Sequence, residues 1–575
     1  METKERRWPL AAAAALYTAL GLFYLRPVWQ VWQDRIAPNT ADPLFNLWVL
    51  KWGVHQIRMG LPDLWNANIF HPTRGTLALS DHLIGPALQI ALFDNAIAGY
   101  NFLFFSSFVL TGLAVCWVVR RSGASWIAAV LAGAMYVFSP FRLTHLNHIQ
   151  LLLAQWVPLT LWFWDRLLAE RKVRDAVLFL IFYLLNVTGG AYLAYMVHIP
   201  LLVILLNRVA IHRRDLVGGL RVLAPVALMA GAALIAVFLP YVRVGRDLGL
   251  ARDAGEIGDY GATLASWVSP ARNALWFGPI NKAYEQRRLG PAAEPFFRTE
   301  NALFAGFVPT FLAALGLWKR RPDPWERGLL LSGLACFALA HPIVYVPMMH
   351  VLPGLSGMRV PARFAAFVSL AVVHLAAKGT DRLLARRKFV LVGALALVLF
   401  AELTPRPVHW ARLEREEDFP EVYSWIAKQD DVKAVLELPV RPNNSEIVYM
   451  YYSTRHWKPI ANGYSGYRPE SHRRITESMR FLPDEPGLDL LSSLGITHLV
   501  VHTRALKKPG MLPRWERDFV GRRVEPVAVF GEARVYRLLS SSNPNRAGLW
   551  KSAGVVRVGD QQVNSGAPSR GRSTR

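Results

Sequence analysis

Long apolar runs recur through most of this chain, and they constrain its fold more than any other feature. Several contain about 17 or more apolar residues, enough for a helix to cross a hydrocarbon core about 30 Å thick. Hydrophobic residues make up 53% of the 575 positions and charged residues 18%, which is too apolar for a soluble globular protein of this size. The sequence therefore predicts a polytopic α-helical membrane protein.

Eleven candidate spans can be placed in residues 1–404. They cover residues 9–31, 97–119, 125–138, 149–165, 175–187, 189–207, 222–240, 302–318, 327–340, 362–379 and 388–404. Basic clusters fall at every second gap, at residues 120–121, 166–174, 208–221, 319–321 and 382–388. With a cytoplasmic N-terminus, the positive-inside rule places all five clusters on the cytoplasmic face. We expect about 11 transmembrane helices in a bacterial cytoplasmic (inner) membrane.

The first apolar segment and the net charge each have a second interpretation. The segment could imitate a signal peptide, but it continues to Trp32 without a clear cleavage site, which favours an uncleaved span. The formal net charge of +24 could suggest nucleic acid, yet the basic residues lie in short clusters between apolar runs. Cys116 and Cys336 both lie inside apolar runs, so we expect no disulfide framework.

Residues beyond 404 have a different character. DVKAVLELPV and ITHLVVHTR are typical of buried strands, and EDFPEVYSWIAKQ and GLDLLSSLG are typical of helices. We predict an extracytoplasmic α/β domain at residues 405–539. The tail at 540–575 is rich in Ser, Gly, Asn and Arg, which predicts a disordered basic segment.

The polar outer loops are the first place to look for chemistry, and the largest are residues 34–96 and 241–301. In the first, Asp42 opens an amphipathic run to Trp52 whose aromatic residues suit a helix at the membrane interface. A carboxylate there can serve as a general base. It can equally cap its helix, because Asp before Pro43 is a common helix start. Asp81 and His82 offer a second acid and an imidazole, or a solvated loop end.

His145 and His148 lie three positions apart, which would place them on one helical face near the outer boundary. Two histidines at this spacing could bind a metal, but the sequence offers no nearby carboxylate and no HExxH pattern. Contact with a polar head group, assisted by Gln155, is the alternative that we favour over metal binding, beside a structural role. The sequence supports no cofactor, although a divalent cation stays open.

Arg359 and Arg363, in MRVPARF, lie at the outer mouth of a span, against the usual inward bias of basic residues. A guanidinium fits a phosphate, although snorkelling to lipid head groups would also explain these positions. Glu300 precedes a span on the same face, where it can assist a base or cap a helix. P-loop, GxGxxG and GxSxG motifs are all missing from the sequence, so nucleotide-driven transport has no motif support.

The segments ADPLFNLW, SPFRLTHLNHIQLLLAQWVPL, MRVPARF and YYSTRHWKPIANGYSG, with a first span and a large outer loop, resemble GT-C superfamily membrane glycosyltransferases. The similarity is to a poorly characterised bacterial branch, of the protein O-mannosyltransferase and aminoarabinose transferase type. It covers residues 9–539 in layout.

This resemblance implies an enzyme that moves a sugar from a polyprenyl-phosphate donor to a lipid, glycan or protein acceptor on the outer membrane face. The family has a catalytic acidic residue in the first outer loop, close to the first span, and Asp42 occupies that position. Paired acidic residues are frequent there, and Asp81 is the candidate partner. Arg359 and Arg363 would then stabilise the departing phosphate.

Two other functions stay open from sequence alone. A lipid-linked saccharide transporter or a non-catalytic cell-envelope assembly subunit would also use many spans and an outer domain. Duplicated halves would favour a transporter, and the sequence has no visible internal repeat.

Overall fold

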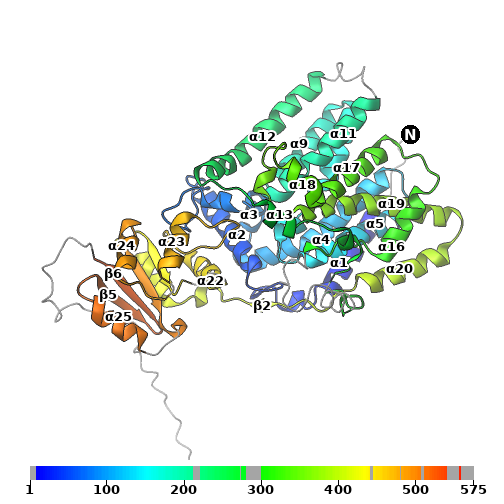
Figure 1. Ribbon diagram of the computed structural model, residues 1–575. Helices are drawn as coiled ribbons and strands as arrows, with labels where there is room; N and C mark the ends of the chain where they lie inside the picture. The colour runs from blue at the N-terminus through cyan, green and yellow to red at the C-terminus, as the bar shows by residue number, and fades with distance from the viewer. Residues whose placement is uncertain are drawn as a thin grey trace, which may run out of the picture. The chain divides into compact units, whose positions relative to one another are not determined.

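A computed structural model describes residues 8–211, 220–271, 273–279, 300–440, 444–479, 481–506, 510–539 and 556–557. The chain forms two compact units, which Figure 1 shows as a large helical part and a smaller part around a sheet. The first unit comprises Met1–Ala67, Arg74–Leu413 and Ser465–Tyr467. The second comprises Asn68–Thr73, Glu414–Tyr464 and Arg468–Arg575. The expected tail at 540–575 lies outside the described residues, apart from 556–557.

Helices make up most of the regular secondary structure of the first unit. They are α1 (Trp8–Tyr24), α2 (Asp42–Arg58), α3 (Ile84–Ile90), α4 (Ala96–Arg121), α5 (Trp126–Val137), α6 (Pro140–Thr144), α7 (Ile149–Leu152), α8 (Trp156–Glu170), α9 (Val173–Val187), α10 (Ala191–Met196), α11 (His198–Ile211), α12 (Leu220–Asp247), α13 (Ala254–Asp259), α16 (Phe307–Leu317), α17 (Pro324–Ala340), α18 (Pro342–Met348), α19 (Ala365–Ala385) and α20 (Phe389–Leu403).

Five of these helical segments are long and apolar enough to cross a membrane, or six if the bent pair α17 and α18 is one span. The five are Ala96–Arg121, Trp126–Thr144, Ala191–Ile211, Arg221–Asp247 and Pro361–Ala385. Helices α1, α16 and α20 are apolar but shorter. The fold therefore supports a membrane protein, while the expected 11 spans and the orientation remain predictions.

Close helix packing in this unit depends on small residues. Gly316 on α16 and Gly379 on α19 lie against the facing backbones. A Cβ atom at Gly316 would lie 2.0 Å from the carbonyl oxygen of Leu375, and one at Gly379 would lie 1.9 Å from that of Leu312. Backbones can approach this closely only where the side chain is absent.

Helix α2 differs from the expected interfacial helix. Its residues from Pro43 to Gly53 are buried within the protein, on every side of the helix. An amphipathic helix lying flat on a membrane would leave one face to water, so the expected exposed face of Asp42 to Trp52 is wrong, whereas its depth in the membrane stays a prediction. Burial of α2 holds its N-terminal residue, Asp42, in a fixed position.

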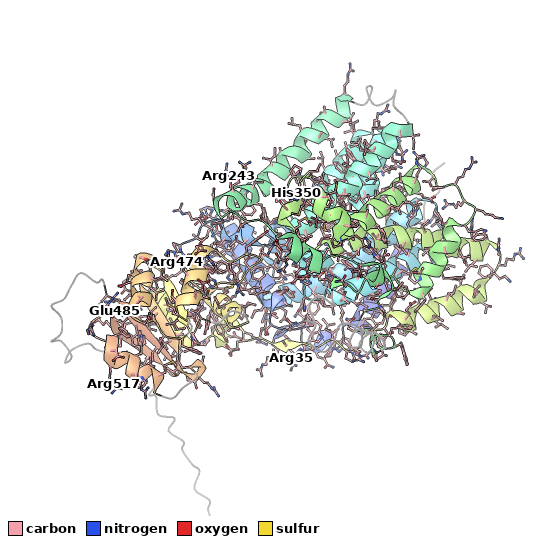
Figure 2. The ribbon with its side chains drawn as sticks, in the orientation of Figure 1. Arg35, Arg243, His350, Arg474, Glu485 and Arg517 are labelled. Atoms are coloured by element: carbon pink, nitrogen blue, oxygen red, sulfur yellow. The ribbon has the colours of Figure 1, made fainter. Side chains whose placement is uncertain are left out.

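The second unit is built on a sheet with strand order β3-β4-β6-β5-β7. Its strands are β3 (Val435–Leu438), β4 (His498–His502), β5 (Val524–Phe530), β6 (Ala533–Leu538) and β7 (Val556–Arg557), and its helices are α21 (Glu421–Lys428), α22 (Asn444–Ser453), α23 (Glu470–Ser478), α24 (Glu485–Ser493) and α25 (Met511–Phe519). Strands β3 and β4 are parallel, and β4, β6 and β5 are antiparallel. Leu436, Leu499 and Trp515 belong to its buried core, whereas Arg474 and Arg517 lie exposed on its surface (Figure 2).

Candidate functional site

Asp42 is the first residue of the buried helix α2. The residue that caps this helix is Ala41, and no side chain forms the cap hydrogen bond. The Asp42 carboxylate instead faces His148, with Oδ2 3.3 Å from the imidazole Nε2. Its side chain keeps 24% of its surface exposed, whereas that of His148 keeps 6%. The carboxylate thus lies at the accessible edge of a buried polar group.

His145 and His148 do not share a helical face, which corrects the prediction from their spacing. Helix α6 ends at Thr144, and the two histidines flank the turn that leads into α7. Arg142 fixes this turn, because its buried guanidinium donates to the carbonyl oxygens of Val137 and Leu152. The two imidazole centroids lie 5.5 Å apart. A turn, rather than a helix, therefore brings the two rings together.

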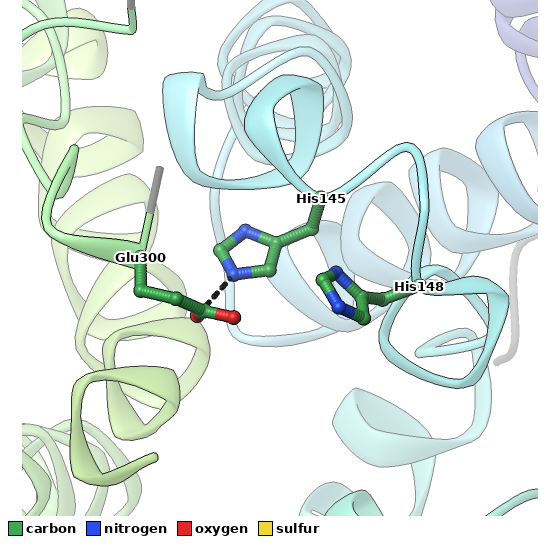
Figure 3. A group of neighbouring side chains, drawn as sticks. All are labelled: His145, His148 and Glu300. Atoms are coloured by element: carbon green, nitrogen blue, oxygen red, sulfur yellow. Dashed lines mark hydrogen bonds and ion pairs between the residues drawn. The ribbon is translucent and has the colours of Figure 1, made fainter. Parts of the chain in front are cut away.

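Glu300 lies between His145 and Arg363, and the sequence did not indicate this contact. Figure 3 shows the Glu300 carboxylate pointing toward the two imidazoles. His145 Nε2 lies 2.7 Å from Oε2, and Arg363 donates to Oε1 at 2.7 Å. All three side chains are at least 96% buried. The expectation that no carboxylate lies near the histidines is therefore wrong, since Glu300 is 155 positions away in sequence but adjacent in space.

Two hydrogen bonds fix the orientation of the His145 ring. Its Nδ1 lies 2.6 Å from the carbonyl oxygen of Phe141, and its Nε2 faces the Glu300 carboxylate. Glu300 is thus held between the His145 imidazole and the Arg363 guanidinium.

Burial and charge act against each other on Glu300. Burial by itself would raise the pKa of this carboxyl, but Arg363 and His145 hold the pKa well below its usual range. For His148, burial lowers the pKa, Arg363 lowers it further, and Asp42 opposes both effects. Glu300 is therefore ionised and His148 neutral near pH 7, so His148 can accept or donate a proton toward Asp42.

His145, His148 and Glu300 each offer a metal-ligand atom, and these atoms lie within 4.8 Å of one another. Their hydrogen bonds do not fit a bound cation. Arg363 already donates to Glu300 and contacts Nε2 of His148 at 3.2 Å. Both ring nitrogens of His145 already have hydrogen-bond partners. Arg363 thus supplies the positive charge that a divalent ion would otherwise provide.

Tyr192 contacts three of the predicted residues, Asp81, Arg359 and Arg363. Its backbone N–H donates to Oδ1 of Asp81 at 3.2 Å, and the Arg363 guanidinium lies 4.6 Å from the centre of its ring. Its hydroxyl accepts the backbone N–H of Arg359 at 3.3 Å. Burial raises the pKa of Asp81, although the N–H of Tyr192 and the charge of Arg363 oppose this rise. Asp81 thus belongs to the same network as Arg363.

Arg359 and Arg363 occupy different environments. Arg363 is buried and already contacts a carboxylate and an imidazole, which excludes both snorkelling to lipid and free access to a phosphate. Arg359 keeps 30% of its side chain exposed, with its guanidinium 4.9 Å from the ring centre of Tyr260. Arg363 therefore does not lie beside Arg359 on an accessible surface, as the sequence had suggested, and a role of Arg359 toward a phosphate stays a prediction.

His82 and Gln155 lie apart from this cluster, as far as the described contacts show. His82 is buried, with its ring edge-on to Trp65 and Tyr241, and burial lowers its pKa to about 4. Gln155 precedes α8, and its buried Oε1 has no hydrogen-bond partner in the described part of the chain. Their predicted role in substrate binding has no contact that supports it.

Sequence reasoning missed Tyr192, Arg252 and Glu256. The signal for Tyr192 was the Gly189-Gly190 pair just before it. A Cβ atom at Gly190 would lie 3.1 Å from Oδ1 of Asp81, so a side chain at this position would crowd that carboxylate. No comparable sequence signal marks Arg252 and Glu256.

The sequence profile of a family described as "Domain of unknown function (DUF6311)" matches residues 9–404. No curated protein matches the sequence.

The chain is similar to several solved structures. The oligosaccharyltransferase of Archaeoglobus fulgidus in complex with Zn and sulfate is 14% identical, with a TM-score of 0.49 over 90% of this chain and 72% of that one. The same archaeal protein, AglB, with an inhibitory peptide and a dolichol-phosphate is 13% identical, with a TM-score of 0.47 over 94% and 74%. ArnT from Cupriavidus metallidurans bound to undecaprenyl phosphate is 13% identical, with a TM-score of 0.46 over 92% and 98%.

Proposed function

We propose that this chain, which belongs to the DUF6311 family, is a membrane glycosyltransferase that takes a sugar from a polyprenyl-phosphate donor. The contact between Asp42 and His148 is the observation that supports this function best. It places a partly exposed carboxylate beside a neutral imidazole, at the edge of a buried cluster that also contains Arg363 and Glu300.

Asp42 serves as the general base. It accepts the proton of the acceptor hydroxyl or amine as that group attacks the anomeric carbon. The bond between the anomeric carbon and the phosphate oxygen breaks, and its electron pair leaves with the polyprenyl phosphate. Attack from the opposite face inverts the configuration of the anomeric carbon.

His148 assists the base Asp42 through their contact. Its Nε2 faces both Oδ2 of Asp42 and the guanidinium of Arg363. When Asp42 gains a proton, the new O–H can donate to Nε2, so the proton has a defined position between the two residues. Arg363 and Glu300 then hold the imidazole rather than contact the substrate.

Arg359 is the candidate group for the leaving phosphate. It is partly exposed, whereas Arg363 is buried among protein partners. Charge grows on the phosphate as the glycosidic bond breaks, and a positioned guanidinium stabilises this charge. No nucleotide is needed for this step, in keeping with the sequence, which has no nucleotide-binding motif.

Transfer of radiolabelled sugars from a set of polyprenyl-phosphate donors to membrane glycans tests this function. We expect Asp42→Asn to reduce transfer by about 100-fold or more, which is the range for loss of a general base. Asp63→Asn is the matched control, because Asp63 is an exposed carboxylate of the same loop.

A thermal melt of each purified variant shows whether the fold is kept. Unchanged transfer by a folded Asp42→Asn protein would move the chemistry to another carboxylate. Absence of transfer by the wild type with every donor, together with movement of a lipid-linked saccharide across vesicles, would instead favour the transporter.

A further inference from the structure

We propose that the phosphate group of the lipid donor binds between Arg252 and Arg359, in the place where the carboxylate of Glu256 now lies. This inference rests on the proposed function and adds a binding site to it. We call these three residues the Glu256 cluster. They belong to the first unit, and all three side chains are partly exposed.

The Glu256 carboxylate lies between two guanidinium groups. Arg252 NH1 is 3.3 Å from Oε1 and 3.4 Å from Oε2, and Arg359 NH1 is 3.8 Å from Oε1. Both guanidinium groups therefore face the same carboxylate. An oxyanion with a charge of two would balance this pair of arginines better than a single carboxylate.

Aromatic rings fix both arginines. The Arg252 guanidinium lies 3.7 Å from the ring centre of Tyr467, and that of Arg359 lies 4.9 Å from the ring centre of Tyr260. Arg252 also donates to the carbonyl oxygen of Gly466 at 2.6 Å. The guanidinium planes are thus held in place without Glu256, so the site can persist after its carboxylate has moved.

Glu256 itself is the least restrained member. It lies on α13, a helix of six residues, and a third of its side chain is exposed. Arg252 is more buried, with 11% of its side chain exposed. A rotation of the Glu256 side chain would take its carboxylate out of the space between the two guanidinium groups, which their aromatic contacts hold in place.

The Glu256 cluster is linked to the residues around Asp42. The backbone N–H of Arg359 donates to the Tyr192 hydroxyl, and the ring of Tyr192 lies against Arg363. Arg363 contacts His148, which faces Asp42. One continuous set of contacts therefore connects the phosphate site to the base.

The charge of the ligand changes during the reaction. A sugar phosphodiester carries one negative charge, whereas the released monoester carries about 1.5 to 2 near pH 7. Two arginines therefore bind the departing phosphate more strongly than the intact donor, which favours bond breaking. The Glu256 carboxylate then returns to its place between the two arginines. There it competes with the product phosphate for the guanidinium groups and promotes release of the product.

Binding of a fluorescent polyprenyl monophosphate to the full-length protein in nanodiscs tests the site. We expect Glu256→Gln to bind this lipid about tenfold more tightly, because the competing carboxylate is gone. Arg252→Met should bind it about tenfold more weakly. A polyprenol of the same length, which lacks the phosphate, should bind all variants equally.

Glu170→Gln is the matched control. Glu170 is also 33% exposed and also pairs with two cations, Arg166 and Lys172, but it lies on α8. We expect it to leave the lipid affinity unchanged. A similar gain in affinity in both Gln variants would overturn the site, since the effect would then be one of net charge.

Unchanged or weaker binding by a folded Glu256→Gln protein would also overturn it. Equal binding of inorganic phosphate alone would overturn it as well, because this result would indicate a site for a free anion. The binding test is independent of transfer. If Asp42→Asn keeps full transfer while Glu256→Gln tightens binding, the base is wrong and the phosphate site stands.

Discussion

His145 donates a hydrogen bond from Nε2 to the Glu300 carboxylate across 2.7 Å, and both side chains are buried. The same carboxylate accepts from Arg363. Glu300 thus pairs with two buried side chains, and its removal should affect both of them.

Glu300→Gln should lower the free energy of unfolding by about 3–5 kcal/mol, because it leaves the buried Arg363 guanidinium without the carboxylate that pairs with it. A chemical denaturation curve in detergent measures this change. Glu256→Gln, at a partly exposed glutamate, should have a much smaller effect. Equal stability of Glu300→Gln and the wild type would show that the buried charges are paired in another way.

Arg363→Ala should convert the cluster into a metal site. Without the guanidinium, His148 and Glu300 lose their cation, and a divalent ion such as Zn²⁺ can replace it. We expect the purified variant to retain Zn²⁺ after dialysis, while the wild type and Arg359→Ala do not. Metal content by mass spectrometry measures this directly. Stoichiometric Zn²⁺ in the wild type would contradict our interpretation of Arg363.

Tyr192 should position the two arginines through separate parts of its side chain. Tyr192→Phe removes the hydroxyl that accepts from Arg359, so we expect a severalfold rise in KM for the donor with little change in kcat. Tyr192→Leu also removes the ring beside Arg363, so kcat should fall as well. Steady-state kinetics separate the two effects. An equal loss in both variants would indicate a merely structural role.

His82 should make the protein sensitive to acid. Burial, opposed only weakly by a backbone carbonyl, lowers its pKa to about 4. The unfolded chain binds a proton near pH 6.5, so stability is complete above that pH and is lost as the pH falls toward 4, by up to about 3 kcal/mol.

Thermal melts at pH 7.5 and 4.5 measure this loss. His82→Gln should lose less stability than the wild type over this interval. His350→Gln, which changes an exposed histidine (Figure 2), should behave like the wild type. Identical pH dependence in all three proteins would refute the assignment.

Local patterns were enough to predict several elements. The apolar runs indicated α4 and α19 because a span needs a long apolar segment, whatever its neighbours are. Strands β3 and β4 were recognisable from short β-branched runs. Strand β5 was missed, since Pro526 interrupts its pattern and the pairing shifts register there.

In the candidate site, too, some properties follow from the sequence and others only from the tertiary structure. The sequence by itself determined which chemical groups are available: Asp42, the two histidines, Glu300 and the arginines. Only the tertiary structure decided their partners, because hydrogen bonds and ion pairs depend on distance in space and not on separation along the chain. It placed Glu300 beside His145, buried Arg363, left Arg359 partly exposed, and put Glu256 between two guanidinium groups.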